Sequence, residues 1–118
     1  MLRVIGLKQL GADHPDTLTS RNNLAYAYRS AGRLAEATAL FERTLADRER
    51  VLGADHPHTL TSRNNLAGAY ESAGRLDQAI PLFERTLAEY ERVLGADHPD
   101  TLTSQNNLER ARTKGNFS

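Results

Sequence analysis

The chain has 118 residues, which is enough for one modest domain with a single core. Its fifteen basic residues balance its fifteen acidic residues, so no overall field attracts nucleic acid or an anionic membrane. The sequence contains no cysteine, which excludes disulfides and thiolate metal sites, and no apolar run long enough to span a membrane. Met1–Leu10 lacks the cleavage signature of a signal peptide, and we therefore expect a cytoplasmic protein.

The dominant feature of the sequence is an internal repeat of 42 residues. Residues 11–52 align with residues 53–94 without a gap, and 33 of the 42 aligned positions are identical. A third copy begins at Gly95, matches the first for fourteen residues except at Gln105, and then diverges. A repeat of this length predicts a solenoid, in which each unit buries its apolar face against its neighbours. The expected organisation is one domain with units at 11–52, 53–94 and a truncated 95–118, preceded by 1–10 as the end of a second helix.

Within a unit the apolar residues recur every three or four positions, which is the period of an α-helix, and no strand signal appears. Two helices fit each unit, and in the first unit they are expected at Pro15–Ala31 and Leu34–Leu52. The polar residues before Pro15 are a helix-start signal, because the missing N–H of proline is harmless in the first turn. Gly32 is expected in a left-handed conformation at the end of a first helix. The sequence therefore predicts an all-α fold, a right-handed α-solenoid of antiparallel helix pairs with two full repeats and partial terminal helices.

Pro81 interrupts this pattern, because it replaces Ala39 inside the expected second helix of the second unit. It has no N–H to donate to the Asp77 carbonyl, and an interior proline costs on the order of 3 kcal/mol, less near the first turn. We expect either a local bend or a late start of this helix.

The string LAYAYRSAGRLAEATALFERTL resembles a tetratricopeptide repeat. The matching residues are Leu24, Ala25, Tyr28, Gly32, Leu34, Ala37, Phe41 and Leu45, and in the second unit Leu66, Ala67, Tyr70, Gly74, Leu76, Ala79, Phe83 and Leu87. The longer unit, with its G-x-D-H-P-x-T linker and N-N-L-A first helix, resembles the kinesin light chain type and its bacterial relatives. Two features depart from the family pattern: Arg21 and Arg63 stand where an aromatic residue is common, and the third unit has Arg112 in place of the tyrosine.

The resemblance implies a concave groove lined by the first helices, in which an asparagine before Leu-Ala hydrogen-bonds the backbone of an extended peptide. On that match the expected peptide contacts are Asn23, Asn65 and Asn107, with Asn22, Asn64 and Asn106 beside them. The residues themselves support a special role, because asparagine is unfavourable inside a helix and its amide both donates and accepts. The alternative is a structural ladder of asparagines between stacked helices.

Selectivity in such a groove has to come from positions that differ between the units. Tyr26 stands where the second unit has Gly68, and Arg29 stands where it has Glu71. We expect Tyr26 to project into the groove opposite the space left by Gly68. Arg29 and Glu71 are expected to recognise opposite charges on a ligand, and the alternative for these two is solvated surface variation.

The acid-histidine-proline cluster that opens each unit is the other candidate site. Aspartate and histidine are common metal ligands and proton carriers. The copies are displaced, however, by one repeat thickness, on the order of 10 Å, and each supplies too few ligands. We therefore interpret the cluster as a helix start; the remote alternative is a metal site through His14, His56, His58 and His98.

The sequence thus predicts a module that binds a protein or peptide in the groove of the first helices. No nucleophile elbow or phosphate-binding loop is present, so we expect no enzyme activity, no cofactor, and no nucleic-acid or membrane partner. By resemblance, bacterial proteins often carry such units as the sensor or scaffold part of larger signalling proteins. The alternative is a self-assembling repeat that forms homo-oligomers through its solenoid ends, because the third unit lacks a second helix to cover its outer side.

Overall fold

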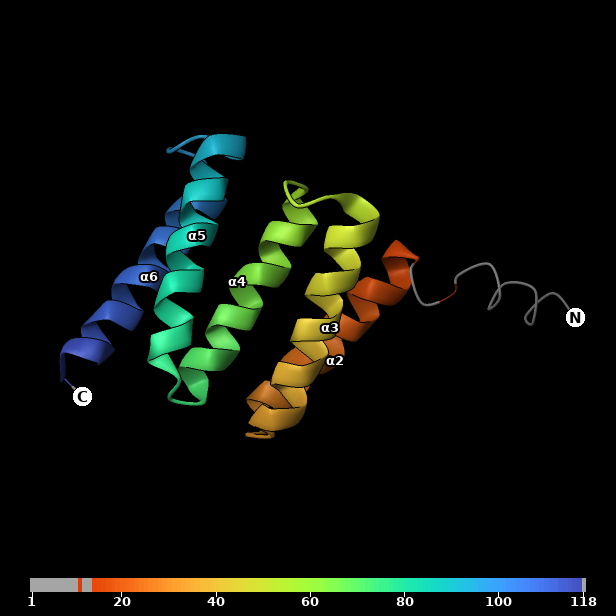
Figure 1. Cartoon of the computed structure of the whole chain (residues 1–118), viewed down its shortest axis with the longest axis horizontal. Coiled ribbons are helices and arrows are strands. Elements are labelled where there is room, and N and C mark those ends of the chain that lie inside the picture. The colour runs from red at the N-terminus through yellow and green to blue at the C-terminus, as the bar shows by residue number, and fades with distance from the viewer. Residues whose placement is uncertain (1–10, 12–13, 118) are drawn as a thin grey trace, which may run out of the picture.

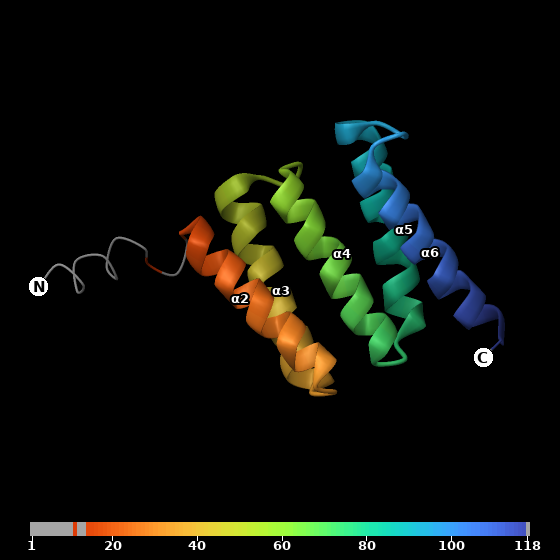
Figure 2. The ribbon, with the colours of Figure 1, turned by 180° about the vertical axis from the view of Figure 1, so that it is seen from behind.

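The computed structural model describes residue 11 and residues 14–117, which form five helices and no strand (Figure 1). The helices are α2 Pro15–Ser30, α3 Leu34–Leu52, α4 Pro57–Ser72, α5 Leu76–Leu94 and α6 Pro99–Phe117. Each helix packs on the next, with α2, α4 and α6 in one layer and α3 and α5 in the other (Figure 2). The all-α repeat fold is therefore confirmed, whereas the expected helix end at 1–10 lies outside the described residues. None of these five helices is both long and apolar enough to cross a membrane.

Each first helix begins at a proline and is capped by the histidine before it. Nδ1 of His14 accepts the N–H of Asp16 at 3.1 Å. His56 and His98 each accept the N–H two residues further on, at 3.0 and 3.1 Å. The start signal is confirmed, and the group that satisfies the free N–H of the first turn is an imidazole nitrogen.

The first helices of the two full units end at glycines in the left-handed conformation, with φ of 81° at Gly32 and 77° at Gly74. The Gly32 N–H donates to the Arg29 carbonyl at 3.0 Å, and the Arg33 N–H donates to the Tyr28 carbonyl at 2.8 Å. This pair of bonds is a Schellman closure, and it turns the chain into the second helix. In both units the arginine after the glycine lies over the tyrosine ring, 4.6 Å from its centroid.

The core combines small alanines with large leucine, phenylalanine and tyrosine side chains. Its fully buried members include Ala25, Ala37, Phe41, Ala67, Ala79 and Phe83. Leu24 departs from this pattern, because it is 48% exposed while its counterpart Leu66 is 5% exposed. Leu66 belongs to α4, which lies between α3 and α5, whereas the described residues place no helix on the outer side of α2. Burial at this position therefore depends on the preceding unit.

Pro81 lies inside α5 and does not delay the start of that helix. α5 begins at Leu76, the position equivalent to Leu34 at the start of α3. The late start considered from the sequence is therefore wrong. The physical reason is that Ala79 and Phe83, on either side of the proline, are buried in the core and hold this stretch in place.

Arg48 is a buried cation that joins three helices. From α3, its guanidinium donates to Ser62 Oγ on α4 at 2.7 Å and to Thr19 Oγ1 on α2 at 3.3 Å. In the second unit the equivalent residue is Tyr90, which cannot supply the same fork of donors. Ser104, the counterpart of Ser62, consequently has a buried hydroxyl with no hydrogen-bond partner in the described part of the chain.

Phe83→Ala is expected to lower the free energy of unfolding by roughly 3–5 kcal/mol, because it leaves a cavity in the core. Tyr26→Ala removes an aromatic ring that is 53% exposed and should change the stability far less. Urea unfolding followed by circular dichroism measures both. Equal midpoints for Phe83→Ala and the parent chain would contradict this packing.

Removing the two equivalent serine hydroxyls is expected to have unequal effects. Ser62→Ala deprives the buried Arg48 of an acceptor and should cost about 1–3 kcal/mol of stability. Ser104→Ala removes a hydroxyl without a partner among the described residues and should be neutral or slightly stabilising. The two variants are matched in size and position, and thermal melts in which they shift equally would refute the role given to Arg48.

Candidate functional site

The histidine clusters serve the helix starts in this structure. Each Nδ1 is used by a backbone N–H, and no group of three potential metal ligands gathers among residues 11 and 14–117. The rings of His56 and His58 meet edge to face, with centroids 5.0 Å apart. Burial, together with the positive charge of Arg48 and the neighbouring His56, lowers the pKa of His58. The lowered pKa favours the neutral form of His58, but no third ligand gathers beside it in the described part of the chain.

The asparagine pairs form a ladder across the layer of first helices. Asn65 Nδ2 on α4 donates to Asn22 Oδ1 on α2 at 3.2 Å. Asn107 Nδ2 on α6 donates in the same way to Asn64 Oδ1 on α4 at 3.4 Å. The ladder considered from the sequence is thus present, and it uses the first asparagine of one unit and the second of the next. Asn23, which takes no part in it, is exposed.

Among the described residues, the ladder uses one polar atom of each asparagine side chain on α4 and leaves the other polar atom available to a ligand. Asn65 has given its Nδ2 to the ladder and keeps its Oδ1 acceptor, whereas Asn64 has given its Oδ1 and keeps its Nδ2 donors. Both side chains are only partly buried. The middle helix therefore presents one amide acceptor and one amide donor beside each other.

These amides line a depression that we call the first-helix hollow, with a volume of about 240 Å³. Its lining is Tyr26, Arg29, Asn64, Asn65, Gly68, Phe83, Asn107 and Arg110. Apart from Phe83 of α5, every lining residue belongs to a first helix, so the hollow crosses all three units. Five of the nine groove residues predicted from the sequence are brought together here, whereas Asn22, Asn23, Asn106 and Glu71 are not part of this lining.

Arg29 extends from α2 across to α4. Its Nε donates to Ser72 Oγ at 2.9 Å, and its guanidinium covers Gly68. A Cβ atom at position 68 would lie 2.9 Å from Arg29 Nη1, so a side chain there would push the guanidinium away. The glycine of the second unit is thus matched to the arginine of the first, a pairing across units that the sequence did not suggest.

Glu71 is buried beneath α6 and holds that helix. Its side chain is 2% exposed, and its carboxylate accepts two bonds from Arg110, at 2.9 and 2.7 Å, and lies 2.9 Å from Lys114 Nζ. Burial alone would raise the pKa of Glu71, but the hydrogen bonds and charges of Arg110 and Lys114 outweigh it and lower the pKa. The alternatives for Glu71 were recognition of a charged ligand and solvated surface variation; its side chain is not solvated, and its carboxylate is engaged by Arg110 and Lys114 within the fold.

Two members of the hollow carry no recognisable signal in the sequence. Arg110 lies in the third unit after the repeat has diverged, so no equivalent position marked it. Phe83 was expected only as a core residue. The hollow therefore contains two arginines, Arg29 and Arg110, and no acid.

Comparisons with known proteins agree with this architecture. A profile of the tetratricopeptide repeat family matches residues 2–50, 16–88 and 64–118. The kinesin light chain nearly identical TPR-like repeats of Podosopora anserina, solved twice, share 35% identity with this chain, with TM-scores of 0.79 and 0.76. Those alignments cover 93% of this chain and 52% of each solved chain, so this chain spans about half their length. No curated protein matches.

The stacked helix pairs and the asparagine ladder define a helical repeat protein. Within that class the chain belongs to the tetratricopeptide repeat family, and its repeats are of the kinesin light chain type.

Glu71→Gln is expected to destabilise the chain at neutral pH and to have little effect in acid. The folded pKa of Glu71 is lowered, so its charge contributes fully above its ordinary pKa of 4.5 and the contribution disappears as the pH falls through the folded value. Urea unfolding of both proteins across this range measures the difference. Glu91→Gln, at an exposed position, is the control, and a difference for Glu71→Gln that stays constant down to the lowest pH would contradict the assignment.

Proposed function

We propose that this chain is a protein-interaction module that binds an extended peptide segment of a partner across the face formed by α2, α4 and α6. Tetratricopeptide repeats mediate protein–protein interaction as a family, and the first-helix hollow supports such a role on this face. The observation that carries the proposal is the pair of amide groups that the ladder leaves available on α4. One donor and one acceptor in the same hollow match the C=O and N–H of one residue of an extended peptide, because these two groups point to the same side of the chain.

The charge of the hollow favours an acidic ligand. Arg29 and Arg110 line it with no carboxylate beside them, and Glu71, the partner of Arg110, is also paired with Lys114. A peptide with aspartate or glutamate beside its bound backbone would therefore find a charge-assisted donor in the Arg29 guanidinium on α2. At such an exposed surface, the charges chiefly set specificity and the rate of association.

Self-assembly through the ends is the second candidate function. Leu24 at one end is 48% exposed and Leu102 at the other is 47% exposed, whereas their counterparts Leu66 and Leu60 are buried. The outer side of α6 is otherwise polar, with Glu109 where α4 has an alanine, and this weakens the case for a contact there. Light scattering tests it, because a strict monomer at millimolar concentration would remove the candidate.

Asn65→Ala and Asn22→Ala break the same ladder bond, but only Asn65 lines the first-helix hollow. We expect the two variants to lose similar, small amounts of stability. Peptides are first selected with the parent chain from an array of random ten-residue sequences. Asn65→Ala should lower the affinity for these peptides by about 3- to 10-fold, the effect of one lost hydrogen bond. If Asn22→Ala weakens the same peptides equally, the asparagines serve the stacking of the units and not the ligand.

The charge preference has its own test on the same array. Arg29→Gln should reduce the enrichment of aspartate and glutamate among the bound peptides. Arg43→Gln removes an exposed arginine from α3, in the other layer of helices, and should leave the enrichment unchanged. An array that shows no acidic enrichment with the parent chain would refute the preference.

A further inference from the structure

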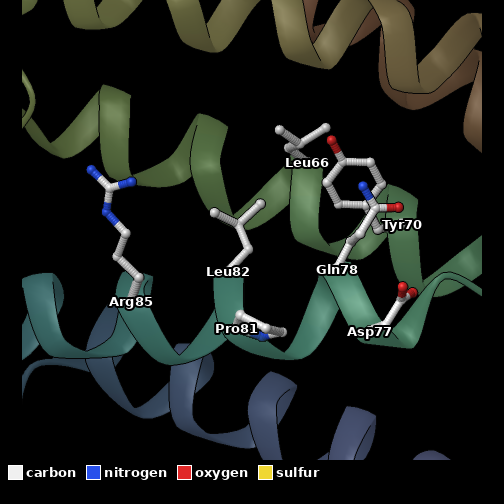
Figure 3. Close-up of a pocket in the computed structure, with 7 residues that line it drawn as sticks. All are labelled: Leu66, Tyr70, Asp77, Gln78, Pro81, Leu82 and Arg85. Carbon is white, nitrogen blue, oxygen red and sulfur yellow. The ribbon is translucent and has the colours of Figure 1, made fainter.

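A second depression lies between α4 and α5. We call it the second-helix cleft; its lining is Leu66, Tyr70, Asp77, Gln78, Pro81, Leu82 and Arg85, and its volume is about 430 Å³. Figure 3 shows Leu82 pointing from α5 toward Leu66 in the middle of the cleft, with Asp77 and Gln78 at one end and Arg85 at the other. The middle of the cleft is thus apolar and its ends are polar. It shares no lining residue with the first-helix hollow.

The cleft contains three of the nine positions at which the two full units differ. Asp77, Gln78 and Pro81 stand there in place of Ala35, Glu36 and Ala39. Its other four residues are the same in both units. The apolar middle of the cleft is therefore common to both units, whereas its Asp77–Gln78 end and its proline occur only in the second unit.

The cleft offers little to the backbone of an extended ligand. Gln78 Oε1 already accepts a bond from the arginine three residues before it, and the Tyr70 hydroxyl donates to Glu42 Oε2 at 3.0 Å. Pro81 supplies no N–H, so the Asp77 carbonyl lacks its usual i+4 donor. An extended peptide would bury unpaired amides against these side chains, whereas a helix satisfies its own backbone.

The two ends of the cleft are lined by opposite charges, Asp77 at one end and Arg85 at the other, and Arg75 borders the Asp77 end with its guanidinium engaged by Gln78 and the Tyr70 ring. Asp77 lies in the first turn of α5 and Arg85 lies eight residues later, which along a helix is about 12 Å. The carboxylate and the backbone carbonyl of Asp77 favour a basic donor, and the guanidinium of Arg85 favours an acidic acceptor. A ligand with charges of both signs is therefore bound in one direction.

We propose that the second-helix cleft docks an amphipathic helix of a partner protein. The helix inserts one aliphatic or aromatic side chain between Leu66 and Leu82. About one turn away on one side it presents lysine or arginine to Asp77, and about one turn away on the other side it presents aspartate or glutamate to Arg85. This surface is independent of peptide binding at the first-helix hollow.

The test is a phage-displayed library of helix-forming peptides of about 18 residues, randomised on one face and selected on the full chain. Enriched peptides are expected to carry an apolar residue flanked at helical spacing by a basic and an acidic residue. Asp77→Lys should weaken their binding about tenfold or more, while Ala35→Lys, which puts a lysine at the equivalent position of the first unit, should not. Leu82→Asn should also weaken them, with Leu40→Asn as the matched control for any loss of stability.

Exchanging the charges gives the sharpest outcome. The double variant Asp77→Arg with Arg85→Glu should select peptides in which the basic and acidic residues have changed places. The proposal is overturned if no helical peptide is enriched, if the enriched sequences lack helical periodicity, or if Asp77→Lys leaves their affinity unchanged. It is also overturned if Asn65→Ala weakens the binding of the enriched peptides, because they would then bind at the first-helix hollow. A dimer of the chain that Asp77→Lys abolishes would overturn it too, because the cleft would then bind a second copy of the chain.

Discussion

The geometry of the first-helix hollow depends on the direct contact between first helices of adjacent units. α2 touches α4 and α4 touches α6, and this brings an asparagine of one unit within 3.2 to 3.4 Å of an asparagine in the next. The same closeness lets the Arg29 guanidinium lie on Gly68, where a Cβ atom would intrude to 2.9 Å. A small residue in this layer, Gly68, therefore has a role outside the core. It leaves room for the Arg29 guanidinium between the first helices of adjacent units.

Near-identity of the units does not give them identical surroundings. Arg48 ties α3 to its neighbours through buried hydrogen bonds, whereas Tyr90 at the same place in the next unit leaves the Ser104 hydroxyl without a partner among the described residues. Burial of an unpaired hydroxyl is unfavourable, so the exchange of Arg48 for Tyr90 has a cost that appears one unit further along. A substitution in a solenoid thus acts mainly across the junction between units.

Local signals in the sequence predict the two helices of the first unit to within one residue of their observed ends, because caps, prolines and glycines act on their nearest neighbours. Burial is less local: Leu24 fits the core pattern and is nevertheless half exposed, because its cover has to come from the preceding unit. From the sequence, the asparagine pair is either a ladder or a ligand contact. The hydrogen bonds show the ladder, and they leave one polar atom on each of Asn64 and Asn65 that could contact a ligand. The place of Arg110 in the hollow could not be predicted, because the repeat has diverged at that position. The second-helix cleft could not be predicted either, because it depends on how α4 and α5 pack.

The hollow and the cleft differ in chemistry and share two helices. On α4, Asn64, Asn65 and Gly68 line the hollow while Leu66 and Tyr70 line the cleft, since successive helical residues point about 100° apart. α5 contributes to both in the same way, with Phe83 on one side and Leu82 on the other. Ligands at the two surfaces influence each other only if one of them shifts α4 against α5. The buried alanines and Phe83 between these helices resist such a shift, because a close-packed core has no room for a continuous displacement.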